Sequence, residues 1–187
     1  MIRAIAILLL SAVAARAGDA HQLVVDFEAA VLLQSNNDLA NRIEQWVEKG
    51  VVFRLAYPPK KSKAKGLVMF FPHVGTGRKG ILCAMALEPI PVRATFPTPV
   101  TSVTVSFWGS TGTPALLEAF DSEGKVLDRA SLESVPGRKA PADPVPIFTM
   151  TVSGKRIAYI QFSGPREGEY LVADEVRFTP IEDAVWN

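Results

Sequence analysis

Strict alternation of apolar and polar side chains over residues 101–108 is the feature that most constrains the fold of this chain. Apolar residues in this segment alternate with hydroxyl residues, namely Val103, Val105 and Phe107 with Ser102, Thr104 and Ser106. A period of two places one set on each face of an extended chain. The segment therefore predicts a β-strand with one buried face and one solvated face.

Strand-like segments recur along almost the whole chain, and no helices alternate with them. Nine further segments are rich in β-forming residues: 22–28, 51–57, 67–71, 81–87, 116–121, 125–132, 148–152, 156–162 and 170–178. This order disfavours a parallel α/β fold. The sequence predicts an all-β protein, an antiparallel β-sandwich or jelly roll of about ten strands.

One segment, near residues 38–49, has the spacing of a short amphipathic helix. Leu39, Ile43 and Trp46 recur at three- and four-residue steps, Val47 follows, and Gly50 is a typical residue at a helix end. We expect Trp46 on such a helix to pack into the core.

The amino terminus has the three parts of a secretory signal peptide. A short cationic start containing Arg3 precedes an apolar run, and small residues at positions 15 and 17 would suit a signal peptidase. The run is shorter than the ~20 residues that cross a bilayer, so we expect no membrane span once the signal is removed. The predicted organisation is a signal peptide (1–17), one sandwich domain (18–180) and a tail (181–187), in a protein that is secreted, periplasmic or on the cell surface.

The charge balance argues against a nucleic-acid partner. The chain has 20 basic and 19 acidic side chains, and Arg3 and Arg16 leave with the predicted signal. A nearly neutral mature chain lacks the basic surface that nucleic acid requires. The basic cluster at 60–65 follows two prolines and is interpreted as a solvated loop.

Acidic residues near the two ends of the domain form a candidate cation site. Asp26 and Glu28 are two residues apart, so on a strand both would point to one face, and Asp174 would join them if the first and last strands are neighbours. Calcium binds six to eight oxygen ligands of this kind. The alternatives are that these acids are solvated, pair with Arg or Lys, or cap loop amides.

Three aromatic residues are candidate ligand contacts: Trp108, Tyr57 and Tyr170. Trp108 is on the wetter face of its strand, beside a Gly/Thr-rich segment, and its flat ring could stack on a sugar. The alternative is that this face is also covered, because aromatic side chains are mostly buried. A glycosidase would need two carboxylates about 5–10 Å apart in a cleft, and the sequence gives no sign of one.

Three segments together resemble known domains: Val25-Asp26-Phe27-Glu28 with the following Gly50-Val51-Val52-Phe53; residues 100–127; and Ile160 to Gly164 with Tyr170 to Phe178. This layout resembles jelly-roll domains of exported bacterial proteins, many of which carry a PEP-type C-terminal sorting tail. It is similar, more loosely, to MAM domains and to carbohydrate-binding modules of the galactose-binding-like fold. The resemblance implies neighbouring first and last strands, and a structural calcium between them.

The sequence as a whole favours a secreted, non-catalytic binding domain for an extracellular glycan. In this hypothesis Asp26, Glu28 and Asp174 hold the structural cation, and Trp108, Tyr57 and Tyr170 contact the polysaccharide. The alternatives are a structural module that docks on an envelope or matrix protein without a small ligand and, less favoured, a small hydrolase.

Overall fold

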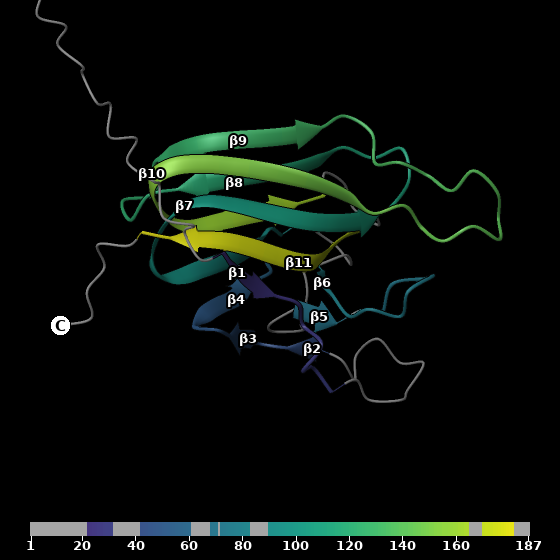
Figure 1. The fold of residues 1–187 in the computed structure, drawn as a ribbon, viewed down its shortest axis with the longest axis horizontal. Helices are drawn as coiled ribbons and strands as arrows, with labels where there is room; N and C mark the ends of the chain where they lie inside the picture. The colour runs from purple at the N-terminus through teal and green to yellow at the C-terminus, as the bar shows by residue number, and fades with distance from the viewer. Residues whose placement is uncertain are drawn as a thin grey trace, which may run out of the picture.

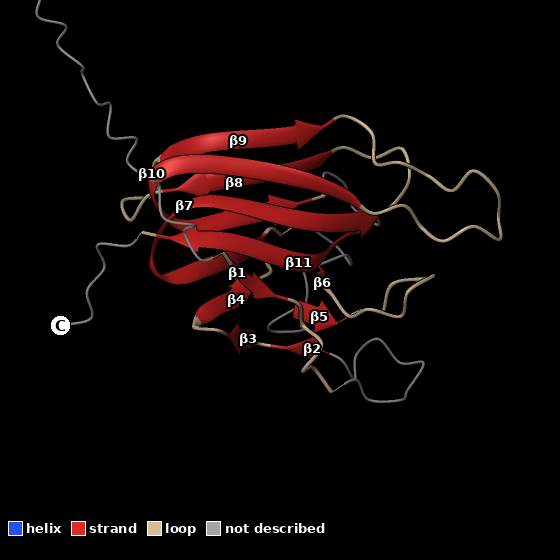
Figure 2. Ribbon diagram, viewed as in Figure 1, coloured by secondary structure: helices blue, strands red, loops and turns tan. Residues whose placement is uncertain are grey.

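A computed structural model of the chain describes residues 22–31, 42–60, 68–70, 72–82, 90–164 and 170–181. The predicted signal peptide, the segment 61–67 that holds most of the basic cluster, and residues 182–187 of the predicted tail lie outside these ranges. Within them the chain consists of strands and loops (Figure 2). No described helix has the length and apolar character needed to cross a bilayer.

Eleven strands are present among the described residues (Figure 1): β1 (Leu23–Val25), β2 (Arg42–Ile43), β3 (Gln45–Glu48), β4 (Val51–Leu55), β5 (Val68–Phe70), β6 (Ile81–Leu82), β7 (Val92–Gly109), β8 (Ala115–Phe120), β9 (Val126–Leu132), β10 (Phe148–Ser163) and β11 (Leu171–Pro180). The described strand pairs are all antiparallel. The predicted all-β, antiparallel sandwich is confirmed, and the segments predicted at 148–152 and 156–162 are two halves of one strand, β10.

Two long strands, β7 and β10, run through both layers of the sandwich. In the first layer, the beginning of β7 pairs with β4 and the end of β10 pairs with β8, with β3 and β9 at the edges. In the second layer, the end of β7 lies between β11 and the beginning of β10. The register between β7 and β10 is irregular from Ser153 to Ile157, where the strands pass from one layer to the other.

The first and last strands of the described chain are neighbours, as the resemblance to jelly-roll domains implies. β1 pairs with β11 in the register Val25 to Val176, and β6 occupies the same edge of β11 further along. The loops that follow β1 and precede β6 are thereby brought close to β11.

One large apolar core lies between the two layers. Val103, Val105 and Phe107 on β7 are fully buried, whereas Ser102, Thr104 and Ser106 are partly exposed on the other face. The Phe107 ring packs on the Phe148 and Phe162 rings of β10, with ring centroids 5.8 and 5.4 Å apart. The alternation in the sequence therefore correctly predicts which side of β7 faces the core.

The helix predicted near 38–49 is wrong for its described part. Residues 42–43 and 45–48 form β2 and β3, and residues 38–41 lie outside the described ranges. β3 and β4 make a hairpin closed by Lys49 and Gly50, both with positive φ (49° and 77°). Two successive residues with positive φ form the turn that best suits the twist of a two-residue hairpin. Gly50 is therefore a hairpin-turn residue rather than a helix end.

Replacing Phe107 with alanine should lower the free energy of unfolding by about 3–5 kcal/mol, because the substitution would leave a cavity in the core between the two layers. Val47→Ala, at a side chain that is 52% exposed, is the control and should change it by less than about 0.5 kcal/mol. Urea unfolding followed by tryptophan fluorescence measures both. Equal effects of the two substitutions would contradict this placement of the core.

Candidate functional site

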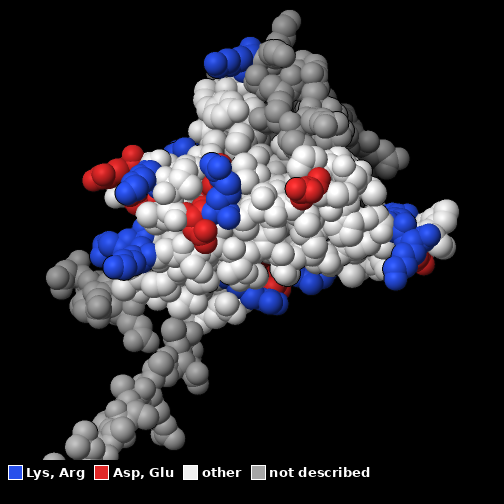
Figure 3. All heavy atoms as spheres, turned by 90° about the horizontal axis from the view of Figure 1, so that it is seen from above, with Lys and Arg blue, Asp and Glu red and all other residues white. Residues whose placement is uncertain are grey.

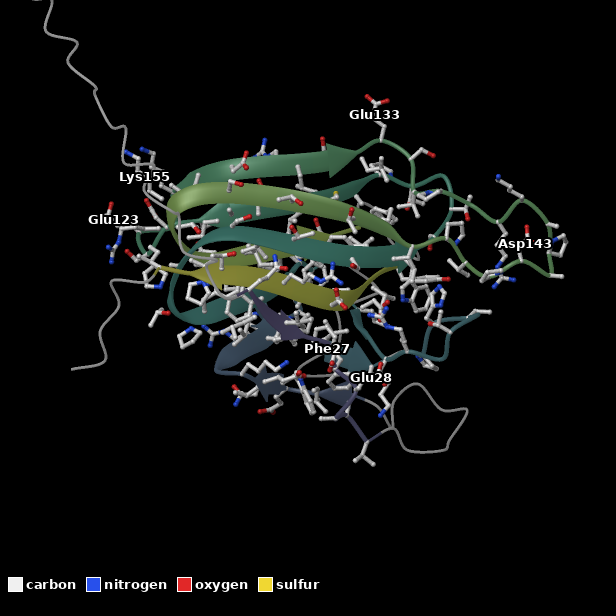
Figure 4. The ribbon with its side chains drawn as sticks, in the orientation of Figure 1. Phe27, Glu28, Glu123, Glu133, Asp143 and Lys155 are labelled. Carbon is white, nitrogen blue, oxygen red and sulfur yellow. The ribbon has the colours of Figure 1, made fainter. Side chains whose placement is uncertain are left out.

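The segment around Asp26 and Glu28 is a turn, not the strand that the sequence predicts. β1 ends at Val25, and Phe27 has φ of 61°, which is uncommon for a residue other than glycine. This conformation directs the Phe27 ring into the core, where it meets Phe53 edge-on at 5.1 Å. The Asp26 carboxylate accepts the Glu28 backbone N–H at 3.2 Å, so it caps the turn. Figure 4 shows Phe27 and Glu28 together at this turn.

Basic side chains occupy the region where the sequence predicts calcium. The Lys79 ammonium donates to the backbone carbonyls of Glu28, at 2.7 Å, and Ala30, and the Lys79 N–H donates to the Glu28 carboxylate at 2.8 Å. The described residues contain no group of three His, Cys, Asp or Glu side chains suited to a metal ion. Because an ammonium group already faces these oxygens, the donor set does not fit a calcium site.

Asp174, the third predicted ligand, is a buried carboxylate beside an arginine. Its side chain is inaccessible to solvent, and Arg78 Nε lies 3.4 Å from Oδ1. The same guanidinium contacts Glu175 at 3.3 Å. Burial raises the pKa of Asp174 above its ordinary value of 3.8, and the positive charge of the neighbouring Arg78 opposes this rise. The alternative of acids paired with basic side chains therefore describes this cluster.

Replacing Lys79 with alanine should lower the free energy of unfolding by about 1–3 kcal/mol, because two backbone carbonyls lose a charged donor. Lys155→Ala, at an exposed lysine on a strand bend, is the matched control. Thermal unfolding with calcium and with EDTA completes the test. If calcium raised the midpoint temperature of unfolding of the wild type, that result would contradict the conclusion that the Lys79 ammonium, and not a metal ion, lies beside these carbonyl oxygens.

The raised pKa of Asp174 predicts a pH dependence of stability. The Asp174 carboxyl binds a proton more tightly in the folded state than in the unfolded state. Its contribution to the free energy of unfolding therefore increases as the pH falls from neutral toward 3.8. The free energy of unfolding of the wild type should therefore rise relative to that of Asp174→Asn as the pH is lowered. Urea titrations at several pH values measure this difference, with Glu133→Gln, at an exposed acid, as control. A relative loss of stability on acidification would refute it.

Trp108 is buried, which corrects the prediction that it contacts a ligand from a wet strand face. It forms a small outer cluster with Leu82 and Val172, on the side of the second layer that faces away from the main core. The rings of His73 and Tyr170 pack edge-on against it, at 5.2 and 5.8 Å. This face is covered by loops, which is the alternative that the sequence left open.

The outer cluster supports a groove at one end of the sandwich, here called the loop-end groove. Its two adjoining hollows, of about 590 and 460 Å³, share Lys139 and Val145. The larger is lined mainly by proline and aliphatic side chains of the β9–β10 loop, and the smaller is lined in part by Thr111, Arg138 and Tyr170. Figure 4 shows Asp143 on this loop, which projects from the sandwich.

His73 fixes the two loops that form the larger hollow. Its Nε2 lies 2.8 Å from the Val145 carbonyl, which only accepts, so Nε2 carries the proton. Nδ1 then accepts the Thr76 backbone N–H at 3.2 Å. Gly75 allows the close approach, since a Cβ there would lie 2.4 Å from Pro144 Cβ. The sequence offers no local signal for this contact, because His73 and Val145 are 72 residues apart.

Tyr170 is held at the groove by the end of β7. The Ser110 N–H donates to the Tyr170 carbonyl at 2.9 Å, and Ser110 Oγ accepts the Tyr170 N–H at 3.0 Å. Gly109 makes this approach possible, because a Cβ there would lie 2.5 Å from the Tyr170 carbonyl oxygen. Of the three predicted contact residues, Tyr170 therefore lines the groove, Trp108 supports it from below, and Tyr57 lies past the end of β4, 47% exposed and outside the groove lining.

Comparison with known proteins gives structural likeness without a family. No family model and no curated protein matches the chain. The module TmCBM61 in complex with β-1,4-galactotriose is similar in fold, with 15% sequence identity over 68% of this chain and 88% of that chain, at a TM-score of 0.41. The K3 adhesin domain of Lys-gingipain from Porphyromonas gingivalis has 12% identity over 74% of this chain and 97% of that chain, at a TM-score of 0.44. CsCBM6-3 from Clostridium stercorarium in complex with cellobiose has 16% identity over 61% of this chain and 82% of that chain, at a TM-score of 0.36. With TM-scores below 0.5, these three do not assign a function to this chain.

Proposed function

We propose that this protein is an exported, non-catalytic domain that binds an extracellular polysaccharide in the loop-end groove. The observation that carries the proposal is Tyr170 in the lining of a hollow of mixed polarity that also contains Thr111 and Arg138 and adjoins the more apolar hollow. Sugar rings have apolar C–H faces that stack on aromatic and proline rings, and hydroxyl groups that need a few well-placed polar partners. The groove supplies both kinds of surface.

The composition of the groove favours binding over hydrolysis. Among its described lining residues there is one carboxylate, Asp143, and it accepts the Ala140 backbone N–H at 2.9 Å. A glycosidase uses two carboxylates flanking the scissile bond. A lone carboxylate engaged with its own loop supports recognition rather than acid–base chemistry.

A second candidate function is docking on an envelope protein at the same end of the sandwich. Two exposed aliphatic side chains favour it: Val74 (49% exposed) and Ile147 (40% exposed), in the loops that form the larger hollow. Exposed apolar side chains beside a hollow are common at protein contacts. This alternative predicts no retention on polysaccharides.

The polysaccharide hypothesis predicts that Tyr170→Ala weakens binding about tenfold, the loss expected for one stacking ring. Tyr170→Phe retains the ring and should bind nearly as well as the wild type. Tyr57→Ala, which removes an exposed tyrosine outside the groove, is the matched control. Affinity gel electrophoresis on galactan, arabinoxylan and pectin measures retention. Retention unaffected by Tyr170→Ala, or absent on all of these glycans, would refute the proposal.

A further inference from the structure

The outward face of the first layer carries two parallel rows of side chains that cross the strands. Residues in register on β8, β10, β7 and β4 form the aromatic row: Phe120, Tyr159, Thr95 and Val52. Next to it, on the same strands, lies the polar row: Glu118, Gln161, Arg93 and Arg54. All eight side chains are exposed or partly exposed, whereas the residues between them along each strand are buried. Both rows therefore face away from the core.

The aromatic row is an ordered, partly exposed surface. The Phe120 and Tyr159 rings stack with centroids 4.8 Å apart and planes 9° from parallel. The Arg93 guanidinium lies 4.3 Å from the centroid of the Tyr159 ring, within the range of a cation–π contact. With the Gln161 amide oxygen turned toward Arg93, it accepts from that guanidinium at 2.9 and 3.2 Å. These contacts fix the position of Arg93 at the junction of the two rows.

The polar row contains two arginines that lie directly opposite each other. Arg54 of β4 and Arg93 of β7 are partners in the antiparallel register. Like charges at such positions repel across about 4.5–5.5 Å between Cβ atoms. At the other end of the row, Glu118 pairs with Arg129 at 2.6 Å. No ion pair joins Arg54 or Arg93 to an acid in the described part of the chain. An anion bound between them would relieve this repulsion.

We infer that this face is a second binding site, for a polysaccharide that carries carboxylate groups. The polysaccharide lies across the strands, with its sugar rings along the outer edges of the stacked Phe120 and Tyr159 rings and a carboxylate between Arg54 and Arg93. Guanidinium groups match the planar carboxylate in shape and charge. Neighbouring strands are about 4.8 Å apart, close to the length of one hexose unit, so successive sugars would meet successive strands.

Two other kinds of polymer fit this face less well. An extended peptide is usually held by adding a strand to a free sheet edge. Here β7, β8 and β10 are each paired on both sides, so their backbone groups are already used. Single-stranded nucleic acid needs a continuous basic groove. The polar row itself ends in an acid, Glu118, and in the view of Figure 3 basic and acidic side chains are likewise interspersed and form no continuous basic band.

Binding of the full protein to polygalacturonate tests this inference, with neutral galactan and oligothymidylate as comparison ligands. Arg54→Gln, at an exposed side chain, should weaken polygalacturonate binding about fivefold, and Arg54→Gln with Arg93→Gln more than tenfold, with a loss that grows as salt is lowered. Phe120→Ala should weaken it about fivefold as well. Arg177→Gln, at an exposed arginine on the second layer, is the matched control and should bind as the wild type does.

Three outcomes would overturn the inference. The first is unchanged polygalacturonate binding in the double arginine variant when its urea unfolding matches that of the wild type. The second is an equal loss of neutral galactan binding, which would remove the role of the carboxylate. The third is tighter binding of oligothymidylate at the same residues. Because Tyr170→Ala leaves both rows intact, its effect separates a failure at the loop-end groove from a failure at this face.

Discussion

The fold depends on β7 and β10 being shared between the two layers. The two strands pair with each other along most of their length; β7 has β4 on its other side in its first half and β11 in its second, and β10 gains β8 in its second half, so both sheets are tied to the same backbone. The pleat then sends alternate side chains of one strand to the core and to the surface. Phe107 and Phe162 belong to different layers by their positions on β7 and β10, yet their rings meet between the sheets. Core and surface are consequently set by the same alternation.

The end of the sandwich that holds the loop-end groove gains its shape from contacts between loops rather than from strands. His73 connects the β5–β6 loop to Val145, and Ser110 connects the end of β7 to Tyr170. Trp108 fills the space between them and takes no part in the main core. A buried aromatic ring thus acts as a platform on which the Tyr170 side chain is presented. The β5–β6 loop also contains Arg78 and Lys79. Their side chains place positive charge beside the carbonyl and carboxylate oxygens that a calcium ion would bind.

Periodicity predicted most strands correctly because the buried and solvated faces differ in composition, as in residues 101–108. It failed near 38–49, where Ile43, Trp46 and Val47 have helical spacing but belong to short strands around the Lys49-Gly50 turn. It also placed Asp26 and Glu28 on one strand face, since the positive φ of Phe27 leaves no mark on composition. The local sequence pattern therefore predicts which side chains are buried better than it predicts where the backbone turns.

The sequence by itself determined most of the strands, the sandwich class and the side of β7 that faces the core, because these follow from local alternation of side chains. That the first and last strands are neighbours was implied only by the resemblance to known jelly-roll domains. Only the tertiary structure decided which distant residues meet: His73 with Val145, Lys79 with the turn after β1, and Arg54 with Arg93. The physical reason is that strand register and loop contacts depend on the packing of the whole chain, and a period of two carries no information about which strand lies alongside.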